Sequence, residues 1–323
     1  REWRRGGWCR CVIREACFSS ENCCFVVSRL LFSNPGRKRL KSGSCRVESV
    51  RAISSGNGIY EQEKMVAYWV RYETDGQVGF GTLEGTEITV HDGDMFAGAR
   101  STGATVSVDD VAFLTPCVPG KMIALWNNSK SSAEKQGLER PEYPLFFLKP
   151  SSSYLAPGGV IRKPAAYDGR VIYEAELGIV IGKTCANVDE ATAAAAIFGY
   201  TCVNDVTAMQ LLDADPSFPQ WARAKGFDTF GAFGPSIVTD LDVSGSAIRA
   251  ELNGRERQNY AVGDLFMQPA EIVARLSESM TLQPGDLIAC GTGPGALPMK
   301  PAATIDVIID GIGTLSNTYE DVS

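Results

Sequence analysis

The stretch Val171-Ile-Tyr-Glu-Ala-Glu-Leu-Gly-Ile-Val-Ile181 places two acidic residues inside a run of apolar and β-branched residues. Such a run predicts a buried β-strand, on which residues two apart point to the same face. Glu174 and Glu176 should therefore lie side by side in an apolar setting. Two like charges in that setting are costly, and one carboxyl group would take up a proton unless a cation lies between them. The pair therefore indicates a site for a hard divalent metal ion.

A third acidic residue, Asp205, directly follows a predicted strand at residues 200–204. A carboxylate at the end of a buried strand is well placed to meet Glu174 and Glu176. Three carboxylates without a histidine or cysteine partner favour an oxygen-preferring ion, so we expect Mg²⁺ or Mn²⁺ ahead of Zn²⁺. The alternative to a metal centre is three solvated acids at the ends of strands.

Elsewhere in the chain, short strands outnumber helices. Residues 67–72, 78–83 and 88–91 alternate between apolar and polar side chains across turn signals, which predicts a small antiparallel β unit. Asn253-Gly254, between two strand-like runs, predicts a two-residue hairpin. The larger body is predicted to hold strands at residues 122–125, 143–148, 200–204, 287–290 and 304–309, and helices at 189–198 and 269–280. Because the helices are not regularly interleaved with the strands, we expect a β-rich mixed α/β fold and not a doubly wound sheet.

Residues 1–64 differ in composition from the rest of the chain. They hold 13 of the 31 Lys and Arg residues, 6 of the 38 Asp and Glu residues, and six of the ten cysteines. The net charge is +7 there and −14 in the remainder. We expect this leader to lie outside the fold, as upstream or cloning-derived sequence, with a transit peptide or a basic interaction arm as alternatives. After it we expect a small β domain at residues 65–118 and a larger, metal-dependent domain at residues 119–323.

The body of the chain argues against some classes of partner. Its acidic charge disfavours nucleic acid and an anionic membrane surface. No apolar run reaches the roughly 18 residues that a membrane-spanning helix needs. Cys117, Cys185, Cys202 and Cys290 are far apart and lie mostly in apolar runs, which is typical of reduced thiols in a core. We therefore expect a cytoplasmic protein that binds neither nucleic acid nor a membrane.

A series of motifs across residues 121–320 resembles, in order and spacing, the fumarylacetoacetate hydrolase superfamily. The motifs are Phe147-Leu-Lys-Pro150, Tyr173-Glu-Ala-Glu-Leu-Gly178, Gly199-Tyr-Thr-Cys-Val-Asn-Asp205, Lys225-Gly-Phe-Asp228, Leu282-Gln-Pro-Gly-Asp-Leu-Ile-Ala-Cys-Gly-Thr292 and Asp310-Gly-Ile-Gly-Thr-Leu-Ser-Asn317. The resemblance implies a β-roll (mixed β-sandwich) catalytic domain with a Mg²⁺ or Mn²⁺ centre, in a homodimer. By matching position it implies that Glu174, Glu176 and Asp205 are the metal ligands.

The same resemblance implies roles for residues around the metal. Lys225 would be a catalytic residue that contacts the oxo or carboxylate oxygens of the substrate. Thr292 would help to bind the substrate carboxylate, beside backbone N–H groups of the Gly-rich turn that begins at Gly291. Lys149 and Gln220 are further candidates for substrate binding.

One segment departs from the superfamily pattern. Many members carry Asn-Tyr-x-x-His with a Glu three residues after the His, and this His/Glu pair activates water. Here the segment is Trp126-Asn-Asn-Ser-Lys-Ser-Ser-Ala-Glu134, so that Ser131 takes the place of the His while Glu134 remains. The usual Arg four residues after the third metal ligand is Met209. The one histidine of the chain, His91, lies in the N-terminal β unit and is expected to be structural.

The expected activity is metal-dependent cleavage of a C–C bond in a 2-oxo acid or 1,3-dicarbonyl compound of the acylpyruvate or fumarylacetoacetate type. It would proceed through a metal-stabilised enolate and belong to aromatic compound catabolism. Because hydrolysis needs a base to activate water, the lost histidine keeps two alternatives open. One is an isomerase, tautomerase or decarboxylase acting on a 2-hydroxy-diene-dioate or an oxaloacetate-like acid, and the other is a metal-binding relative without turnover. Ser131, Glu134 and Lys225 are the candidate catalytic residues.

Overall fold

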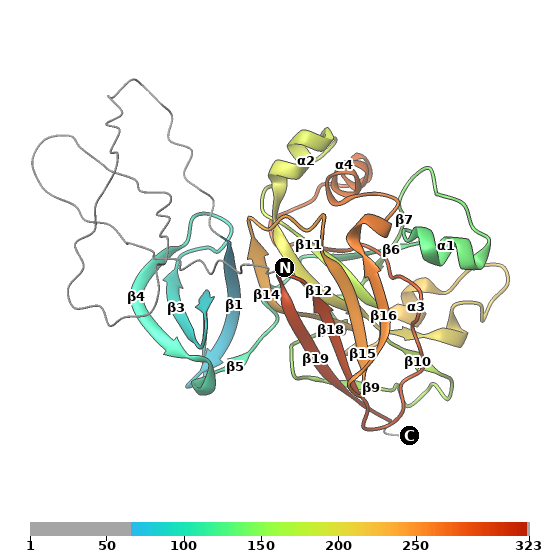
Figure 1. Cartoon of the computed structure of the whole chain (residues 1–323), viewed down its shortest axis with the longest axis horizontal. Coiled ribbons are helices and arrows are strands. Elements are labelled where there is room, and N and C mark those ends of the chain that lie inside the picture. The colour runs from blue at the N-terminus through green and yellow to red at the C-terminus, as the bar shows by residue number, and fades with distance from the viewer. Residues whose placement is uncertain (1–65, 322–323) are drawn as a thin grey trace, which may run out of the picture. The chain divides into compact units, whose positions relative to one another are not determined.

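A computed structural model describes residues 66–321 of the chain. These residues belong to one compact unit, Lys64–Ser323. The leader expected at residues 1–64 lies outside the described residues, as do residues 322–323. The architecture of the described part is shown in Figure 1.

Twelve strands form one large mixed sheet. Ten of them follow the order β4-β3-β2-β1-β14-β12-β11-β17-β6-β7, while β5 pairs with β1 and β8 with β14. Neighbours are antiparallel except for β17 with β6 and β14 with β8, which are parallel. The strands are β1 Ala67–Thr74, β2 Gln77–Glu84, β3 Glu87–Asp92, β4 Arg100–Ser107, β5 Ala112–Phe113, β6 Met122–Trp126, β7 Leu145–Lys149, β8 Tyr154–Leu155, β11 Ala175–Ile181, β12 Ile197–Asp205, β14 Gly231–Thr239 and β17 Leu287–Ala289.

A second sheet of five strands, in the order β16-β15-β18-β19-β9, packs against the first. Strands β11, β12 and β14 contact β15, β18 and β19, and the side chains between the two sheets form the main core. This arrangement confirms the expected β-rich mixed fold with a β-sandwich at its centre. The bounds are β9 Val160–Arg162, β15 Ala247–Leu252, β16 Arg255–Ala261, β18 Thr304–Ile309 and β19 Gly313–Glu320, with β10 Val171–Ile172 and β13 Thr207–Ala208 as a separate short pair.

Short helices complete the described part of the chain. They are α1 Lys130–Gln136, α2 Glu190–Ala196, α3 Trp221–Lys225 and α4 Pro269–Ser279, with 3₁₀ turns η1 Val108–Asp110, η2 Ser151–Ser153, η3 Met209–Leu211 and η4 Val262–Asp264. Helix α4 begins with a proline in its first turn and buries Ile272, Val273 and Leu276 on one face, as its pattern predicts. None of the helices between residues 66 and 321 has the length and apolar character to span a membrane.

Two expectations about the elements need correction, and one strand was missed. The predicted strand at residues 171–181 is interrupted at Tyr173 and Glu174, because the N–H of Glu174 donates to the side-chain oxygen of Asn204 instead of to a neighbouring strand. The helix expected at residues 189–198 ends at Ala196, and Ile197 already belongs to β12. The central strand β14 was not predicted, since its glycines and Pro235 are typical of loops.

Candidate metal centre

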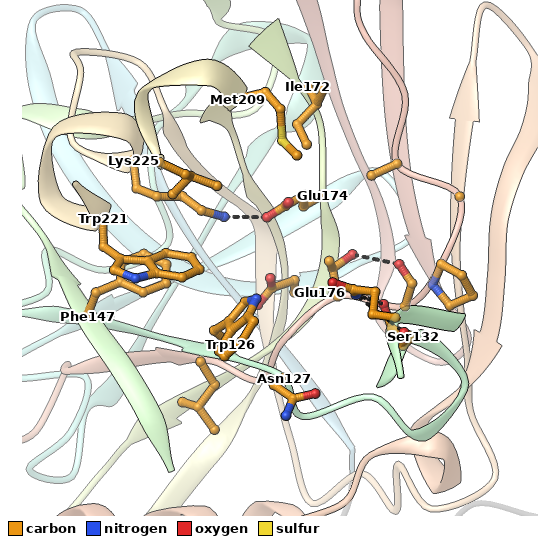
Figure 2. Close-up of a pocket in the computed structure, with 18 residues that line it drawn as sticks. Trp126, Asn127, Ser132, Phe147, Ile172, Glu174, Glu176, Met209, Trp221 and Lys225 are labelled. Carbon is orange, nitrogen blue, oxygen red and sulfur yellow. Dashed lines mark hydrogen bonds and ion pairs between the residues drawn. The ribbon is translucent and has the colours of Figure 1, made fainter. Parts of the chain in front are cut away.

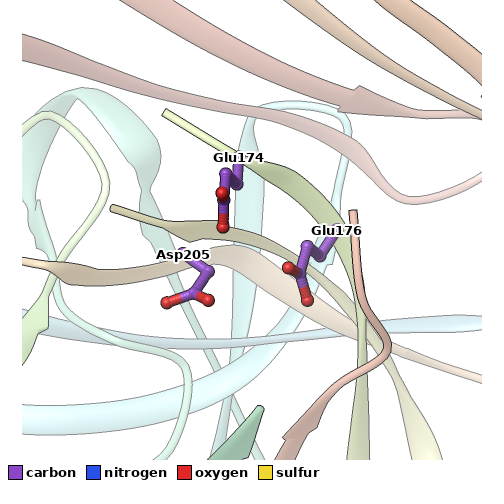
Figure 3. A group of neighbouring side chains, drawn as sticks. All are labelled: Glu174, Glu176 and Asp205. Carbon is purple, nitrogen blue, oxygen red and sulfur yellow. The ribbon is translucent and has the colours of Figure 1, made fainter. Parts of the chain in front are cut away.

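The backbone pairing of β11 with β12 brings the three acidic residues together. Ala175 lies opposite Asn204 in the antiparallel register, so Glu174 comes next to Asp205, whose N–H donates to the carbonyl of Glu174 over 2.9 Å. One carboxylate oxygen from each of Glu174, Glu176 and Asp205 lies within 4.8 Å of the other two. Figure 3 shows the three carboxyl groups converging from the two strands. The structure therefore brings together the three ligands that the sequence predicts.

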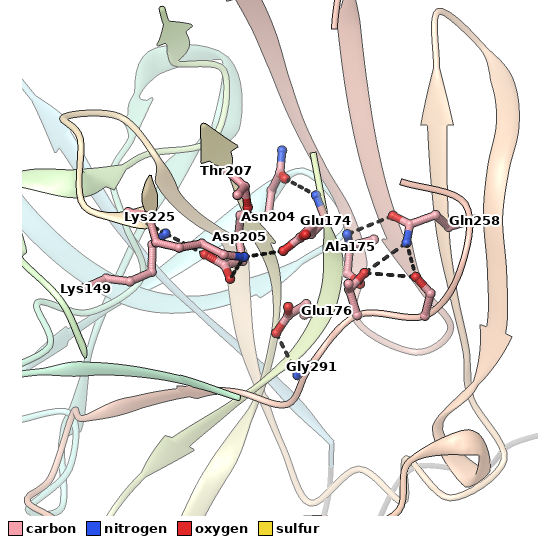
Figure 4. Close-up of polar contacts among 12 residues, drawn as sticks. Lys149, Glu174, Ala175, Glu176, Asn204, Asp205, Thr207, Lys225, Gln258 and Gly291 are labelled. Carbon is pink, nitrogen blue, oxygen red and sulfur yellow. Dashed lines mark hydrogen bonds and ion pairs between the residues drawn. The ribbon is translucent and has the colours of Figure 1, made fainter. Parts of the chain in front are cut away.

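Two lysines stand among these acids in the polar network of Figure 4. Lys225, at the end of α3, donates to Glu174 and to Oδ2 of Asp205, while Lys149 on β7 donates to Oδ1 of Asp205 and to the carbonyl of Lys225. Burial alone would raise the pKa of Asp205, but the two ammonium groups outweigh burial and lower that pKa. Asp205 is therefore held as a carboxylate in the core.

Glu176 has a different environment from Asp205. Its side chain is buried, and the N–H of Gly291 donates to its Oε2 over 2.8 Å. Burial first, and the charge of Asp205 second, raise the pKa of Glu176 well above its ordinary value. Burial likewise raises the pKa of Glu174, against the opposing charge of Lys225.

The cluster fits a hard divalent cation. Its donors are carboxylate oxygens, the ligand type that Mg²⁺ and Mn²⁺ prefer. Without a cation, three carboxyl groups face two ammonium groups, and burial raises the pKa of Glu176 well above its ordinary value. A divalent cation beside Glu174, Glu176 and Asp205 would favour the ionised form of all three.

The Gly-rich turn after β17 is fixed to the start of β11 by a residue that the sequence does not single out. Gln258, buried on β16, accepts from the N–H of Ala175 and donates to the hydroxyl of Thr292 and the carbonyl of Gly293, at 2.8–3.0 Å. The hydroxyl of Thr292 in turn donates to the carbonyl of Ala175 over 3.1 Å. Gln258 therefore holds Thr292 and the residue between the two glutamates in one network.

A cavity of about 300 Å³ opens onto the two glutamates (Figure 2). Aromatic side chains form one side of it: the Trp221 ring lies 5.5 Å from that of Trp126 and 5.4 Å from that of Phe147. The other lining residues are Leu125, Asn127, Ser132, Gln136, Ile172, Met209, Leu212, Lys225, Thr292, Gly293, Pro294, Gly295 and Ala296. A small organic acid fits a space of this size.

Not every predicted site residue reaches this cavity. Lys149 is buried behind Asp205, and Gly291 uses its N–H to hold Glu176. Gln220 precedes α3 and donates to the carbonyl of Phe218, outside the lining. The structure thus gives Lys149 and Gly291 contacts with the predicted metal ligands, and only Thr292 of the four predicted substrate-binding residues lines the cavity.

The predicted catalytic residues on α1 also lie outside the lining. The Ser131 hydroxyl donates to Asp264 over 2.8 Å, and the Ser131 N–H donates to the same carboxylate. Glu134 is exposed and does not line the cavity. Ser132, one residue further along, does line it. Of the three predicted catalytic residues, only Lys225 faces the cavity.

Comparison with known proteins identifies the relatives of this fold and site. The family model described as "Fumarylacetoacetate (FAA) hydrolase C-terminal" matches residues 121–320. The chain belongs to this family. A second model, described as "Rv2993c-like, N-terminal", matches residues 69–116, ahead of the family domain.

Solved structures agree with the family assignment. The chain is similar to 5-carboxymethyl-2-hydroxymuconate delta-isomerase from Mycobacterium smegmatis, with 37% identity and a TM-score of 0.73 over 79% of this chain and 99% of that one. Its similarity to 2-hydroxyhepta-2,4-diene-1,7-dioate isomerase from Mycobacterium marinum is 34% identity and a TM-score of 0.73, covering 80% and 99%. A fumarylacetoacetate hydrolase from Exiguobacterium antarcticum is 27% identical with a TM-score of 0.69, covering 79% and 99%.

The position of Asn128 bears on the family's Asn-Tyr-x-x-His stretch. This chain has two consecutive asparagines, and taking Asn127 as the first residue of the stretch puts Ser131 at the His position. Asn128, however, is the buried one: its amide contacts the backbone of Met267 and the carbonyl of Cys290 at 2.8–3.2 Å. Starting the stretch at Asn128 puts Ser132 at the His position. We adopt this register because Ser132 faces the cavity.

The shifted register also changes the second member of the family's pair. Three residues after Ser132 comes Lys135, so neither the His nor the Glu of the pair is present in this chain. His91 does not replace them, because its ring lies 4.9 Å from that of Trp69 and within 2.9 Å of the Thr89 carbonyl, on β3 of the N-terminal unit.

Proposed function

We propose that this protein is a divalent-metal-dependent enzyme that forms the enolate of a 2-oxo acid and returns the proton elsewhere, as an isomerase or tautomerase does. The observation that carries the proposal is the set of ionisable side chains lining the cavity: Glu174, Glu176 and Lys225. With both glutamates assigned to the metal, Lys225 alone remains for proton transfer. Moving a proton within the substrate needs no separate base for water.

Each of the site's own residues has a part in this proposal. Mg²⁺ or Mn²⁺, when bound, would supply Lewis-acid polarisation of the 2-oxo group. Beside a bound cation, Lys225 would favour its neutral amine, which takes the proton from C3 as the enolate forms. The ammonium so produced holds the enolate oxygen and returns that proton to a different carbon. The aromatic side of the cavity keeps water away from that proton transfer. The Thr292 hydroxyl lines the cavity, and it contacts the substrate carboxylate by giving up its bond to Ala175.

The test is exchange of the C3 protons of a 2-oxo acid in D₂O, followed by proton NMR with Mg²⁺ and 2-oxopentanoate. We expect metal-dependent exchange that is abolished by EDTA and by Lys225→Met. Exchange no faster than without protein would overturn the proposal. This readout precedes product formation, so it reports the enolate whatever reaction follows.

Hydrolysis of a C–C bond in an acylpyruvate is the second candidate, favoured by the likeness to the Exiguobacterium fumarylacetoacetate hydrolase. It requires a group that activates water, and neither Ser131 nor Glu134 lies at the cavity. Product analysis separates the two candidates: acetylpyruvate would give acetate and pyruvate in a hydrolase, and a tautomer of unchanged mass in our proposal. Carbon dioxide release from oxaloacetate would indicate a decarboxylase. A role in aromatic compound catabolism and the homodimer stay predictions, the second to be checked by light scattering.

A further inference from the structure

The walls of the cavity carry an unusual amount of apolar surface for a site that binds an acid. Trp126 and Met209 are 37% and 42% exposed, although both are large apolar side chains. Both line the cavity, on either side of the metal ligands (Figure 2). Large apolar side chains that stay exposed within a concave site are normally covered by an apolar group of the ligand.

The aromatic residues are already arranged to accept such a group. Trp221 packs against Phe147 with an angle of 20° between the ring planes, and Trp126 is tilted by 52° against Trp221. These three residues come from α3, β7 and β6, so their positions are fixed by separate elements of the fold. A flat or branched apolar group can pack against Trp126 without displacing the cluster.

The charges of the cavity also favour a ligand with an apolar group at the end away from the metal. Among its lining residues, all of them within the described part of the chain, Lys225 is the one basic side chain, and it is paired with Glu174 and Asp205. Apart from Glu174 and Glu176, the remaining polar side chains, Asn127, Ser132, Gln136 and Thr292, are uncharged. A second carboxylate at the far end of a substrate would lose its hydration here without meeting a free cation.

We infer that the substrate is a 2-oxo monocarboxylic acid whose far end is an aryl or branched alkyl group, and not a dicarboxylic acid. This inference rests on the proposed function, because it takes the metal and Lys225 to bind the 2-oxo acid end. Met209 is the residue that determines which group is accepted at the end of the substrate away from the 2-oxo acid. It follows β13 on the 3₁₀ turn Met209–Leu211, where a longer basic side chain would bring a cation to the cavity wall.

A matched series of three acids isolates the far end from the reacting end. In 2-oxo-4-phenylbutanoate, 2-oxopentanoate and 2-oxoglutarate, the same 2-oxo acid carries a phenyl, methyl or carboxylate group at the same carbon. We expect kcat/KM for Mg²⁺-dependent C3 proton exchange to fall in that order, with the phenyl compound roughly 10- to 100-fold above 2-oxoglutarate. A 2-oxoglutarate value equal to or above that of the phenyl compound would overturn the inference.

Substitutions of Met209 and Trp126 test whether these residues contact the far end of the substrate. Met209→Arg should lower the ratio of the phenyl to the carboxylate compound by roughly tenfold or more, because it supplies the missing cation. Since Met209 is 42% exposed, the arginine is not forced into the core. Met209→Leu is the matched control that should keep the order of the three acids. Trp126→Ala should bring the phenyl compound down to the level of 2-oxopentanoate, and a ratio unchanged in both Met209→Arg and Trp126→Ala would count against the inference.

Failure of the inference can be told apart from failure of the proposed function. Suppose that 2-oxopentanoate shows metal-dependent exchange and that 2-oxoglutarate has an equal or higher kcat/KM than the phenyl compound. The proposed enolate chemistry would then be supported, and the inference of an apolar group at the far end of the substrate would be rejected. If none of the three acids exchanges its protons, the proposed function fails. Calorimetric binding of the same acids with Mg²⁺ then shows which group the site prefers at the far end of the substrate. Tighter binding of 2-oxo-4-phenylbutanoate supports the inference, and equal or tighter binding of 2-oxoglutarate overturns it.

Discussion

Lys149 donates to Oδ1 of Asp205 from a side chain that is 0% exposed. Lys225 donates to the other oxygen of the same carboxylate, so Asp205 lies between two buried ammonium groups. Because the second contact of Lys149 is the carbonyl of Lys225, one side chain holds both a predicted metal ligand and the lysine that faces the cavity. Lys149 thus organises the site without lining the cavity.

Replacing Lys149 by methionine should destabilise the fold. The change keeps the length of the side chain but leaves Asp205 with one partner and the Lys225 carbonyl without its donor. Breaking a buried ion pair of this kind costs about 3–5 kcal/mol in the free energy of unfolding, which urea denaturation measures. The matched control is Arg162→Met, which removes an exposed pair with Glu320 and should cost less than about 1 kcal/mol. Equal losses in the two variants would contradict a structural role for Lys149.

Metal binding should stabilise the protein through the three carboxylates. At a free Mg²⁺ or Mn²⁺ concentration about 100 times the dissociation constant, binding adds about 2.7 kcal/mol to the free energy of unfolding. Glu176→Gln and Asp205→Asn should abolish this gain, followed as the rise in Tm on adding Mn²⁺. Glu84→Gln, on an exposed residue of β2, is the control that should keep the full rise. A rise that survives in both site variants would show that the metal binds elsewhere.

The clustering of Glu174, Glu176 and Asp205 could be predicted because its signal is local. Two glutamates spaced by one residue in an apolar run, and an aspartate at the end of another such run, need no knowledge of the tertiary structure. The β11–β12 pairing then places Glu174 next to Asp205. The interruption before β11 does not disturb this result, because Asn204 supplies the hydrogen bond that a neighbouring strand would otherwise give.

The supporting residues could not be predicted from local patterns. Gln258 lies on β16 in the second sheet, more than 80 positions from Ala175, and nothing in its own segment marks it as part of the site. The pairing of Lys149 with Asp205 also joins distant segments. Strand β14 was hidden by glycines and Pro235, which tertiary packing tolerates in the centre of this sheet.

Cys117, Cys202 and Cys290 should be unreactive in the folded protein. Burial raises the pKa of Cys117 and of Cys202 to about 12, and that of Cys290 well above its ordinary value. A raised pKa leaves these thiols protonated at pH 8, and the protonated thiol is a poor nucleophile. Alkylation with iodoacetamide at pH 8, mapped by peptide mass spectrometry, should modify them only after denaturation. Peptide mapping distinguishes these cysteines from the six cysteines of residues 1–64. Labelling of Cys202 in the native state would contradict its burial.

The register of the segment before α1 gives a direct test of water activation. If Ser132 and Lys135 occupy the positions of the family's His/Glu pair, Ser132→His with Lys135→Glu should raise hydrolysis of acetylpyruvate, because it places a base at the cavity. General-base catalysis contributes typically 10²- to 10⁴-fold, so a partly aligned pair should still give about a tenfold gain in acetate release.

The one-residue shift supplies the control for this variant. Ser131→His carries the same side chain but removes the hydroxyl that donates to Asp264 over 2.8 Å, and it points the imidazole away from the cavity lining. It should lower stability by about 0.5–1.5 kcal/mol, since Asp264 loses one hydrogen bond but keeps those from the Ser129 hydroxyl and the Ser131 N–H, and it should not raise hydrolysis. A gain with Ser131→His and none with the double variant would restore Asn127 as the start of the stretch. A gain with the double variant alone would show that this chain retains the metal and enolate chemistry of a hydrolase and lacks only its base.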